Sequence, residues 1–176
     1  MLWHVSNLRP RGQVSALLLV AALWTPLAAP PAAAAEVPDV VLSGFQRPDA
    51  RLSDFSGQVV VLHFWATWCP PCLREMESIE AFYAERYPEL AERGLVLLTV
   101  SNDVRMKDLR RFHERTHPSY PIYKDPLSRL HGELGLVGHP ATLVIGRDGE
   151  VLERLFGSHD WSSPSFRARV ERYVVP

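Results

Sequence analysis

The sequence has very little cysteine and no excess of either charge. Two cysteines among 176 residues are too few for a fold that depends on several disulfides or for a zinc site made of four thiolates. Lysine and arginine number 19 against 20 aspartate and glutamate, so the chain lacks the basic excess with which nucleic-acid-binding proteins neutralise phosphates. With 47% hydrophobic and 22% charged residues, the composition indicates one ordinary globular domain.

The first 35 residues have the pattern of a secretory signal peptide. Two arginines precede an apolar run over residues 14–24, and a tract of alanine and proline follows it. Ala33 and Ala35 would supply the small residues of a cleavage site. The apolar run is shorter than the roughly 20 residues of a membrane-spanning helix, which favours a cleaved signal over a permanent anchor. We therefore expect an exported protein whose folded domain spans residues 36–176.

Removal of the signal peptide would take away two positive charges and no negative ones. The remainder has 17 basic and 20 acidic residues, a net charge of −3 with histidine neutral, which again argues against nucleic acid as a partner. We expect export to the periplasm, an oxidising compartment in which disulfides persist.

Hydrophobic patterning predicts alternating strands and helices. Buried strands are expected at 59–65 and 95–100, because these runs are short, apolar and rich in β-branched residues. An Arg-Asp-Gly turn separates two further strand-like runs and predicts a hairpin across 141–157. Helices are expected over 71–87, 104–117, 127–134 and 165–174. This order predicts an α/β fold in which a mixed sheet has helices on both faces.

Both cysteines lie in the sequence FWATWCPPC, residues 64–72, where the first buried strand meets the first helix. A thiolate is the form that attacks a disulfide, and a helix N-terminus stabilises the anion, so Cys69 is the candidate nucleophile. Cys72, one turn later and expected to be buried, would release the partner by forming the Cys69–Cys72 disulfide. The two prolines between them suit the first helical turn and hold the sulfurs together.

Other functions are possible for a pair of cysteines, and the surrounding sequence bears on each of them. A structural disulfide closing so short a loop would restrain the unfolded chain by only about 2 kcal/mol. Zinc would need two further ligands, and delivery of copper by the cysteines with a histidine is the metal function that the pair fits best. Haem attachment is excluded because Leu73 follows Cys72 where a histidine is required. The chain also lacks the Pro-x-x-x-Thr-x-x-Cys segment of peroxiredoxins.

The segment FWATWCPPC and the Leu-Arg-Glu that follows it resemble the active site of the exported thioredoxin-like TlpA/ResA/DsbE family. The resemblance covers about residues 37 to 174 and includes a second motif, Gly-His-Pro-Ala-Thr at 138–142. It implies a thioredoxin fold and a thiol-disulfide oxidoreductase that needs no cofactor beyond its own redox-active disulfide.

The resemblance also implies roles for residues outside the pair. The peptide bond before Pro140 is expected to be cis, with the backbone of His139 pairing with the bound peptide. Glu75 is expected to help proton transfer between the thiols. Trp68 is expected to be a docking surface beside the nucleophile, whereas Trp65 is expected in the core. His139 is unusual in this family and would tune the nucleophilic thiolate or touch the substrate.

Thioredoxin has a buried aspartate at the position of His63. We expect His63 to be a core histidine, with an acid or base role as the alternative. The family implies reduction of protein disulfides, with apocytochrome c as the leading substrate and a membrane thiol reductase as the electron donor. A disulfide-forming oxidant and a copper chaperone are the alternatives. The Cys-Pro-Pro-Cys sequence does not fix the direction, because the potentials of thioredoxin-fold proteins run from about −270 to −120 mV.

Overall fold

The computed structural model describes residues 37–174. The expected signal peptide, residues 1–35, lies outside the described residues. The described strands are β1 (Val41–Gly44), β2 (Ala50–Arg51), β3 (Val59–Trp65), β4 (Leu95–Ser101), β5 (Ile122–Lys124), β6 (Ala141–Ile145) and β7 (Val151–Phe156). The described helices are α1 (Pro70–Glu85), α2 (Tyr87–Glu92), α3 (Met106–Thr116), α4 (Arg129–Glu133) and α5 (Pro164–Glu171), with 3-10 turns at Leu52–Phe55 and Pro126–Ser128.

The strands form one mixed sheet in the order β2-β1-β5-β4-β3-β6-β7. The strand β3 lies inside the sheet, parallel to β4 and antiparallel to β6. All seven of its residues are buried, as its unbroken apolar sequence predicts for a strand covered on both faces. The sequence-based prediction of β3 is confirmed residue for residue, and its carboxyl end delivers the chain to the two cysteines.

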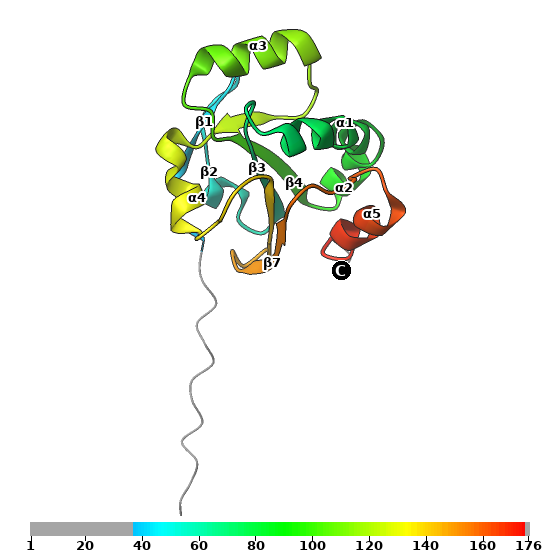
Figure 1. Ribbon diagram of the computed structural model, residues 1–176. Coiled ribbons are helices and arrows are strands. Elements are labelled where there is room, and N and C mark those ends of the chain that lie inside the picture. The colour runs from blue at the N-terminus through cyan, green and yellow to red at the C-terminus, as the bar shows by residue number, and fades with distance from the viewer. Residues whose placement is uncertain (1–36, 175–176) are drawn as a thin grey trace, which may run out of the picture. The chain divides into compact units, whose positions relative to one another are not determined.

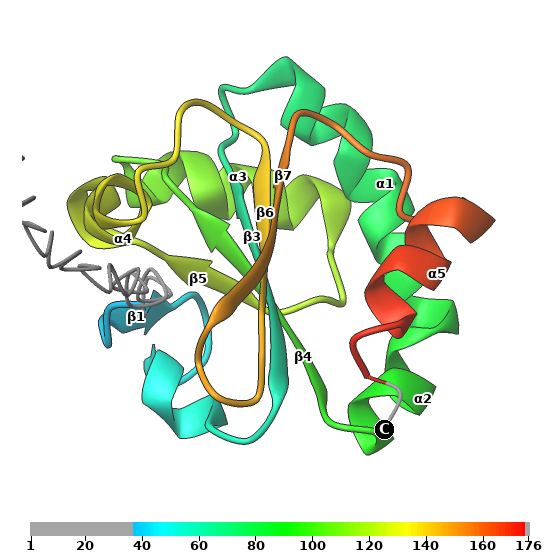
Figure 2. The same cartoon turned by 90° about the horizontal axis from the view of Figure 1, so that it is seen from below.

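Alternate residues of β3 point into two separate cores. Val59, Val61 and Trp65 pack in a core with side chains of α1, α3 and α5, whereas Val60, Leu62 and Phe64 pack in a core that includes α4. Figure 2 shows α1 and α5 side by side on one face of the sheet and α4 on the other. The predicted mixed sheet with helices on both faces is therefore confirmed.

The first predicted helix, over 71–87, corresponds to α1 and extends two residues too far, and the short helix α2 that follows was not predicted. The helix α1 ends at Glu85, and α2 begins at Tyr87 with Pro88 in its first turn. Proline fits a first turn but lacks the backbone N–H that a helix interior requires, so the chain restarts a helix here instead of continuing one.

Other differences from the sequence-based prediction concern short elements and helix ends. The helix expected over 127–134 is a 3-10 turn followed by α4, and Gly135 follows it with a φ of 64°. The strands β1, β2 and β5 were not predicted, because runs of two to four residues carry too little pattern. No helix within residues 37–174 is long and apolar enough to cross a membrane.

Candidate active site

The two cysteines lie at the start of α1 and are joined by a disulfide. Cys69 is the N-cap residue, with extended backbone, and Cys72 is in the first turn. Both side chains are buried, Cys69 at 5% exposure and Cys72 completely. The sulfur that a partner can reach is therefore that of Cys69, as expected for a nucleophile followed by a resolving cysteine.

The prolines between the cysteines determine which backbone N–H can donate a hydrogen bond to the sulfur of Cys69. Pro70 and Pro71 occupy the first helical positions and have no N–H to donate. The N–H of Cys72 donates to Sγ of Cys69 at 3.2 Å. In the reduced protein this donor and the helix N-terminus would stabilise a Cys69 thiolate.

Glu75 lies one helical turn after Cys72 on the same buried face of α1 and is 2% exposed. Its Oε1 accepts a hydrogen bond of 2.6 Å from Nε1 of Trp161 and one of 3.2 Å from the backbone N–H of His159. Its Oε2 is buried and has no partner. Burial raises the pKa of Glu75 to about 7, although both hydrogen bonds act in the opposite direction. This carboxyl group can therefore take up and release a proton near neutral pH.

His63 lies on β3 and is completely buried. Its Nδ1 lies 2.9 Å from Oγ1 of Thr142 on β6, and its Nε2 is buried without a partner. Burial, with smaller contributions from His139 and His159, lowers the pKa of His63 to about 3. The imidazole stays neutral at physiological pH, which supports the core histidine that the sequence analysis favoured over an acid or base.

The peptide bond between His139 and Pro140 is cis, as the family resemblance implies. The His139 ring stacks on His131 with centroids 4.5 Å apart and meets the edge of Trp68 at 5.4 Å. Burial, and next the neighbouring His131, lowers the pKa of His139 to about 4. A neutral ring has no positive charge to offer a thiolate, which leaves substrate contact as the role that we expect for His139.

Trp68 stands beside the nucleophile and is 62% exposed, whereas Trp65 is fully buried. This contrast matches the docking and core positions expected for the two indoles. Asp103 fixes the loop between them, since its carboxylate accepts hydrogen bonds from the backbone N–H of Thr67 at 3.0 Å and from Oγ of Ser101 at 2.7 Å. The loop that presents Trp68 is thereby tied to the end of β4.

Four contributors to the site were not found from the sequence: Asp103, His131, His159 and Trp161. Trp161 acts on Glu75 across 86 residues of chain, and His159 acts through its backbone N–H, which leaves no mark in the sequence. Within residues 37–174, no three histidine, cysteine or carboxylate side chains are grouped as a metal site requires.

Comparison with known proteins places this arrangement in a family. The model of the AhpC/TSA family matches residues 33–154. The chain belongs to the AhpC/TSA family. Among its relatives, the thiol-disulfide oxidoreductase ResA of Geobacillus thermodenitrificans is 33% identical over 121 residues, which cover 69% of this chain and 67% of the relative. ResA of Bacillus anthracis is 29% identical over 122 residues, covering 69% and 68%.

Solved structures share the fold of this chain. A Chlorobium tepidum protein assigned as the thiol:disulfide interchange protein DsbE is 25% identical, with a TM-score of 0.70 over 81% of this chain and 97% of that one. StoA of Bacillus subtilis is 20% identical, with a TM-score of 0.64 over 79% and 98%. The expected thioredoxin fold is confirmed, and the chain is a thiol-disulfide oxidoreductase of the ResA/DsbE type.

Proposed function

We propose that this enzyme is a periplasmic reductant of protein disulfides and that its leading substrate is the cysteine pair of apocytochrome c before haem attachment. The observation that carries the proposal is the sequence of groups along α1: a capping Cys69, a buried Cys72 one turn later and a buried Glu75 one turn beyond that. The signal-peptide pattern of residues 1–35 supports export.

The reaction begins with the reduced enzyme. The Cys69 thiolate attacks one sulfur of the substrate disulfide, whose S–S bond breaks as a mixed disulfide forms, and the first substrate thiolate leaves and takes a proton from water. Cys72 then gives its proton to Glu75 and attacks the sulfur of Cys69, which expels the second substrate thiolate. Two electrons pass from the enzyme to the substrate, and the enzyme is left with its Cys69–Cys72 disulfide.

The oxidised enzyme must then be reduced again. An oxidising compartment offers no ready supply of electrons, so we assign this step to a membrane thiol reductase, whose dithiol becomes a disulfide as the Cys69–Cys72 bond is broken. Glu75 would release its proton for the return to Cys72, and no cofactor is required.

The reduction potential of the Cys69–Cys72 couple tests the direction of electron flow. Equilibration with a glutathione or dithiol buffer is expected to give a potential near that of thioredoxin, about −270 mV. A potential near −120 mV, roughly that of a strong oxidant, would overturn the proposal and make disulfide formation the function.

Trapping tests the substrate. A Cys72→Ser variant keeps the nucleophile and loses the resolving thiol, so it should retain substrates as mixed disulfides. A Cys69→Ser variant is the matched control and should trap none. Apocytochrome c among the trapped proteins would support the assignment. If the periplasm contains apocytochrome c and the variant does not trap it, the assignment is wrong.

A further inference from the structure

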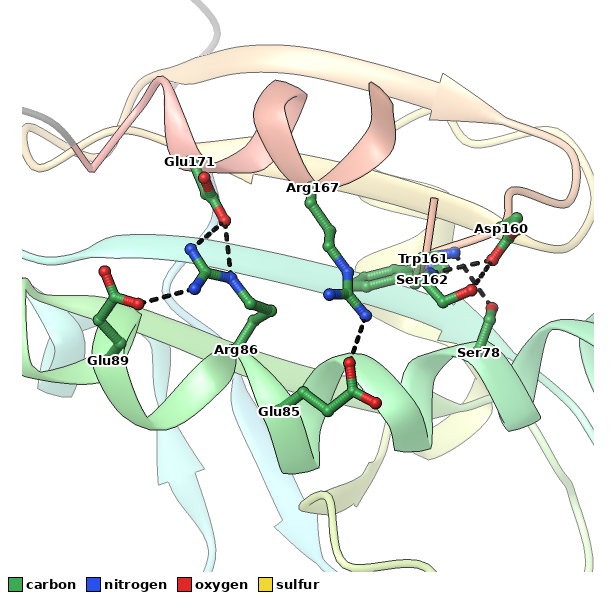
Figure 3. A network of polar contacts seen from close by, with 9 residues as sticks. All are labelled: Ser78, Glu85, Arg86, Glu89, Asp160, Trp161, Ser162, Arg167 and Glu171. Carbon is green, nitrogen blue, oxygen red and sulfur yellow. Dashed lines mark hydrogen bonds and ion pairs between the residues drawn. The ribbon is translucent and has the colours of Figure 1, made fainter. Parts of the chain in front are cut away.

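The segment between β7 and α5, residues 157–163, is fastened to α1. The backbone N–H of Trp161 donates to Oγ of Ser78 at 3.1 Å. Farther along, Arg167 pairs with Glu85 of α1 at 2.7 Å, and Glu171 pairs with Arg86 at 2.7 Å (Figure 3). These contacts, together with the side-by-side course of α5 and α1 in Figures 1 and 2, hold the segment at a fixed place over the helix that carries the cysteines.

The indole of Trp161 is the part of this segment that enters the core. It is fully buried and packs against Phe82 and Phe166, with ring centroids 5.6 and 4.8 Å away, and against the edge of His63 at 5.4 Å. In this packed position its Nε1 points to Oε1 of Glu75 at 2.6 Å. Rotation of the indole is prevented on each of these sides, so the donor stays directed at the carboxyl group.

The kinds of donor at Glu75 fix where its proton resides. An indole N–H and a backbone N–H donate and cannot accept, and both converge on Oε1. A protonated Oε1 would place hydrogen against hydrogen, so the neutral acid carries its proton on Oε2. That oxygen is buried and has no partner among the described residues, which leaves it open to exchange a proton.

We propose that Trp161 is a positioning residue of the thiol chemistry, because its indole N–H holds one oxygen of the Glu75 carboxyl group and reserves the other for the proton exchanged with Cys72. This inference rests on the proposed function for the proton-accepting part of Glu75. A hollow of about 460 Å³ lies between the segment and α1 and is lined by Glu75, Ser78, His159 and Asp160 among others.

Several other charged or titratable groups surround Glu75, and their titrations must be distinguished from that of Glu75. Arg74 and Glu77 stand on α1, His159 and Asp160 on the segment, and His63 on β3. On β7 and α5, Glu153 and Arg169 act on the ring of His159. Burial, and next Arg169, lowers the pKa of His159 below its usual value. A His159→Asn variant removes that ring and keeps the backbone N–H, and it should leave the titration of Glu75 in place.

A spectroscopic titration tests the contact without any need for activity. In the oxidised, ¹⁵N-labelled protein, the indole N–H resonance of Trp161, identified by its loss in a Trp161→Phe variant, should shift with pH and show a midpoint near 7, about the pKa of Glu75. In Glu75→Gln the resonance should no longer titrate. A Trp161 resonance that does not respond to pH in the unaltered protein would overturn the proposal.

Single-turnover reduction of a disulfide-bonded peptide, followed from about pH 5 to about pH 9, tests the effect on chemistry. Loss of a hydrogen bond to a carboxylate raises its pKa by about one unit, so Trp161→Phe should move the Glu75-dependent midpoint up by about one pH unit. At pH 7 the rate should fall about fivefold, because a smaller fraction of Glu75 is then ionised. The Trp161→Phe change made in a Glu75→Gln background should produce no further shift.

Trp65→Phe is the matched control. Trp65 is also a fully buried indole in the same core, but its Nε1 has no hydrogen-bond partner. Both variants lose similar volume, so circular dichroism and urea unfolding should report similar loss of stability, while only Trp161→Phe moves the pH profile. Equal shifts of the pH midpoint in Trp161→Phe and Trp65→Phe would overturn the inference about Trp161 and leave the proposed function standing. A profile left unchanged by Glu75→Gln would instead remove Glu75 from the proposed function, and the inference with it.

Discussion

The α1 side of this site contains the buried Glu75, and the β3–β6 side contains the buried His63. Burial shifts the pKa values of these two groups in opposite directions. On the α1 side the pKa of Glu75 rises to about 7, and on the β3–β6 side the pKa of His63 falls to about 3. Burial disfavours the charged form in both cases. The charged form of Glu75 is the deprotonated one, so its pKa rises, whereas the charged form of His63 is the protonated one, so its pKa falls. The same physical effect brings the carboxyl group into the working range of pH and takes the imidazole out of it.

The difference shows why a buried histidine beside the cysteines does not replace a carboxylate. His63 is neutral over the physiological range and is held to Thr142 through Nδ1, so its contribution is to packing and to the β3–β6 pairing. Glu75 has two donors on one oxygen and none on the other. We therefore assign proton exchange to the α1 side of the site.

The largest difference is expected in the rate of disulfide reduction. Glu75→Gln removes the group that we propose as acceptor of the Cys72 proton, and loss of general base catalysis slows such a step by about 10²-fold or more. His63→Asn keeps a polar atom near the position of Nδ1 and should change the rate by less than about threefold. Single-turnover kinetics on a disulfide-bonded peptide measure both. A slower His63→Asn than Glu75→Gln would mean that the proton acceptor lies on β3.

Protein stability should depend on pH with opposite signs through the two groups. Glu75 has a raised pKa in the folded state, so its contribution is full below pH 4.5 and is lost as the pH rises through 7. His63 has a lowered pKa, so its contribution is present above pH 6.5 and is lost as the pH falls toward 3. Between about pH 5 and 6.5 the two slopes oppose each other.

Single variants should expose each slope. Compared with the unaltered protein, the change in the free energy of unfolding from pH 5 to pH 6.5 should be about 2 kcal/mol more positive in Glu75→Gln and about 2 kcal/mol more negative in His63→Asn, because each variant removes one titrating group while His139 and His159 contribute equally to all three proteins. Urea unfolding at several pH values measures both. Differences of the same sign from the unaltered protein in the two variants would show that burial does not shift the two pKa values in opposite directions.

The sequence was sufficient for the parts of the fold that are long and apolar. The strand β3 followed from a short run rich in β-branched and aromatic residues, and the start of α1 followed from two prolines that suit a first helical turn. The short strands β1, β2 and β5 could not be predicted, since they exist through pairing with β5, β1 and β4 and carry no periodicity of their own. Tertiary pairing, not local preference, makes them strands.

The residues of the site also fall into two groups, those found from the two sequence motifs and those brought to the site by tertiary packing. Cys69, Cys72 and Glu75 lie within seven residues and were found together, and the second motif supplied His139 and Pro140. The partners that set the properties of Glu75 come from a loop 84 and 86 residues away. A tryptophan in that loop has the same appearance in the sequence as any core residue. The motif identifies the reacting groups, whereas their pKa values depend on the packing that the motif does not contain.

A smaller effect on stability should confirm that the β3–β6 side is structural. Thr142→Val leaves Nδ1 of His63 buried without a partner, which should cost about 1–3 kcal/mol in the free energy of unfolding. Thr99→Val is the control. Thr99 is also buried, and its Oγ1 donates to the carbonyl of Pro121. That carbonyl also accepts from the backbone N–H of Thr99, which the variant keeps, so the loss of stability should be smaller. Urea unfolding compares the two, and an equal loss would contradict a role for the His63 contact.

The smallest change in stability is expected at Trp68, which is 62% exposed between the two sides and meets the ring of His139. Trp68→Ala should alter the free energy of unfolding by less than about 0.5 kcal/mol, yet it should raise KM several-fold for a folded protein disulfide. The rate with hydroxyethyl disulfide should not change, because so small a substrate needs no docking surface. Leu152→Ala, 45% exposed on β7, is the control and should leave both substrates unaffected. If Trp68→Ala slows both substrates equally, the indole acts on the Cys69 thiolate instead of on the partner, and the two sides of the site are coupled through it.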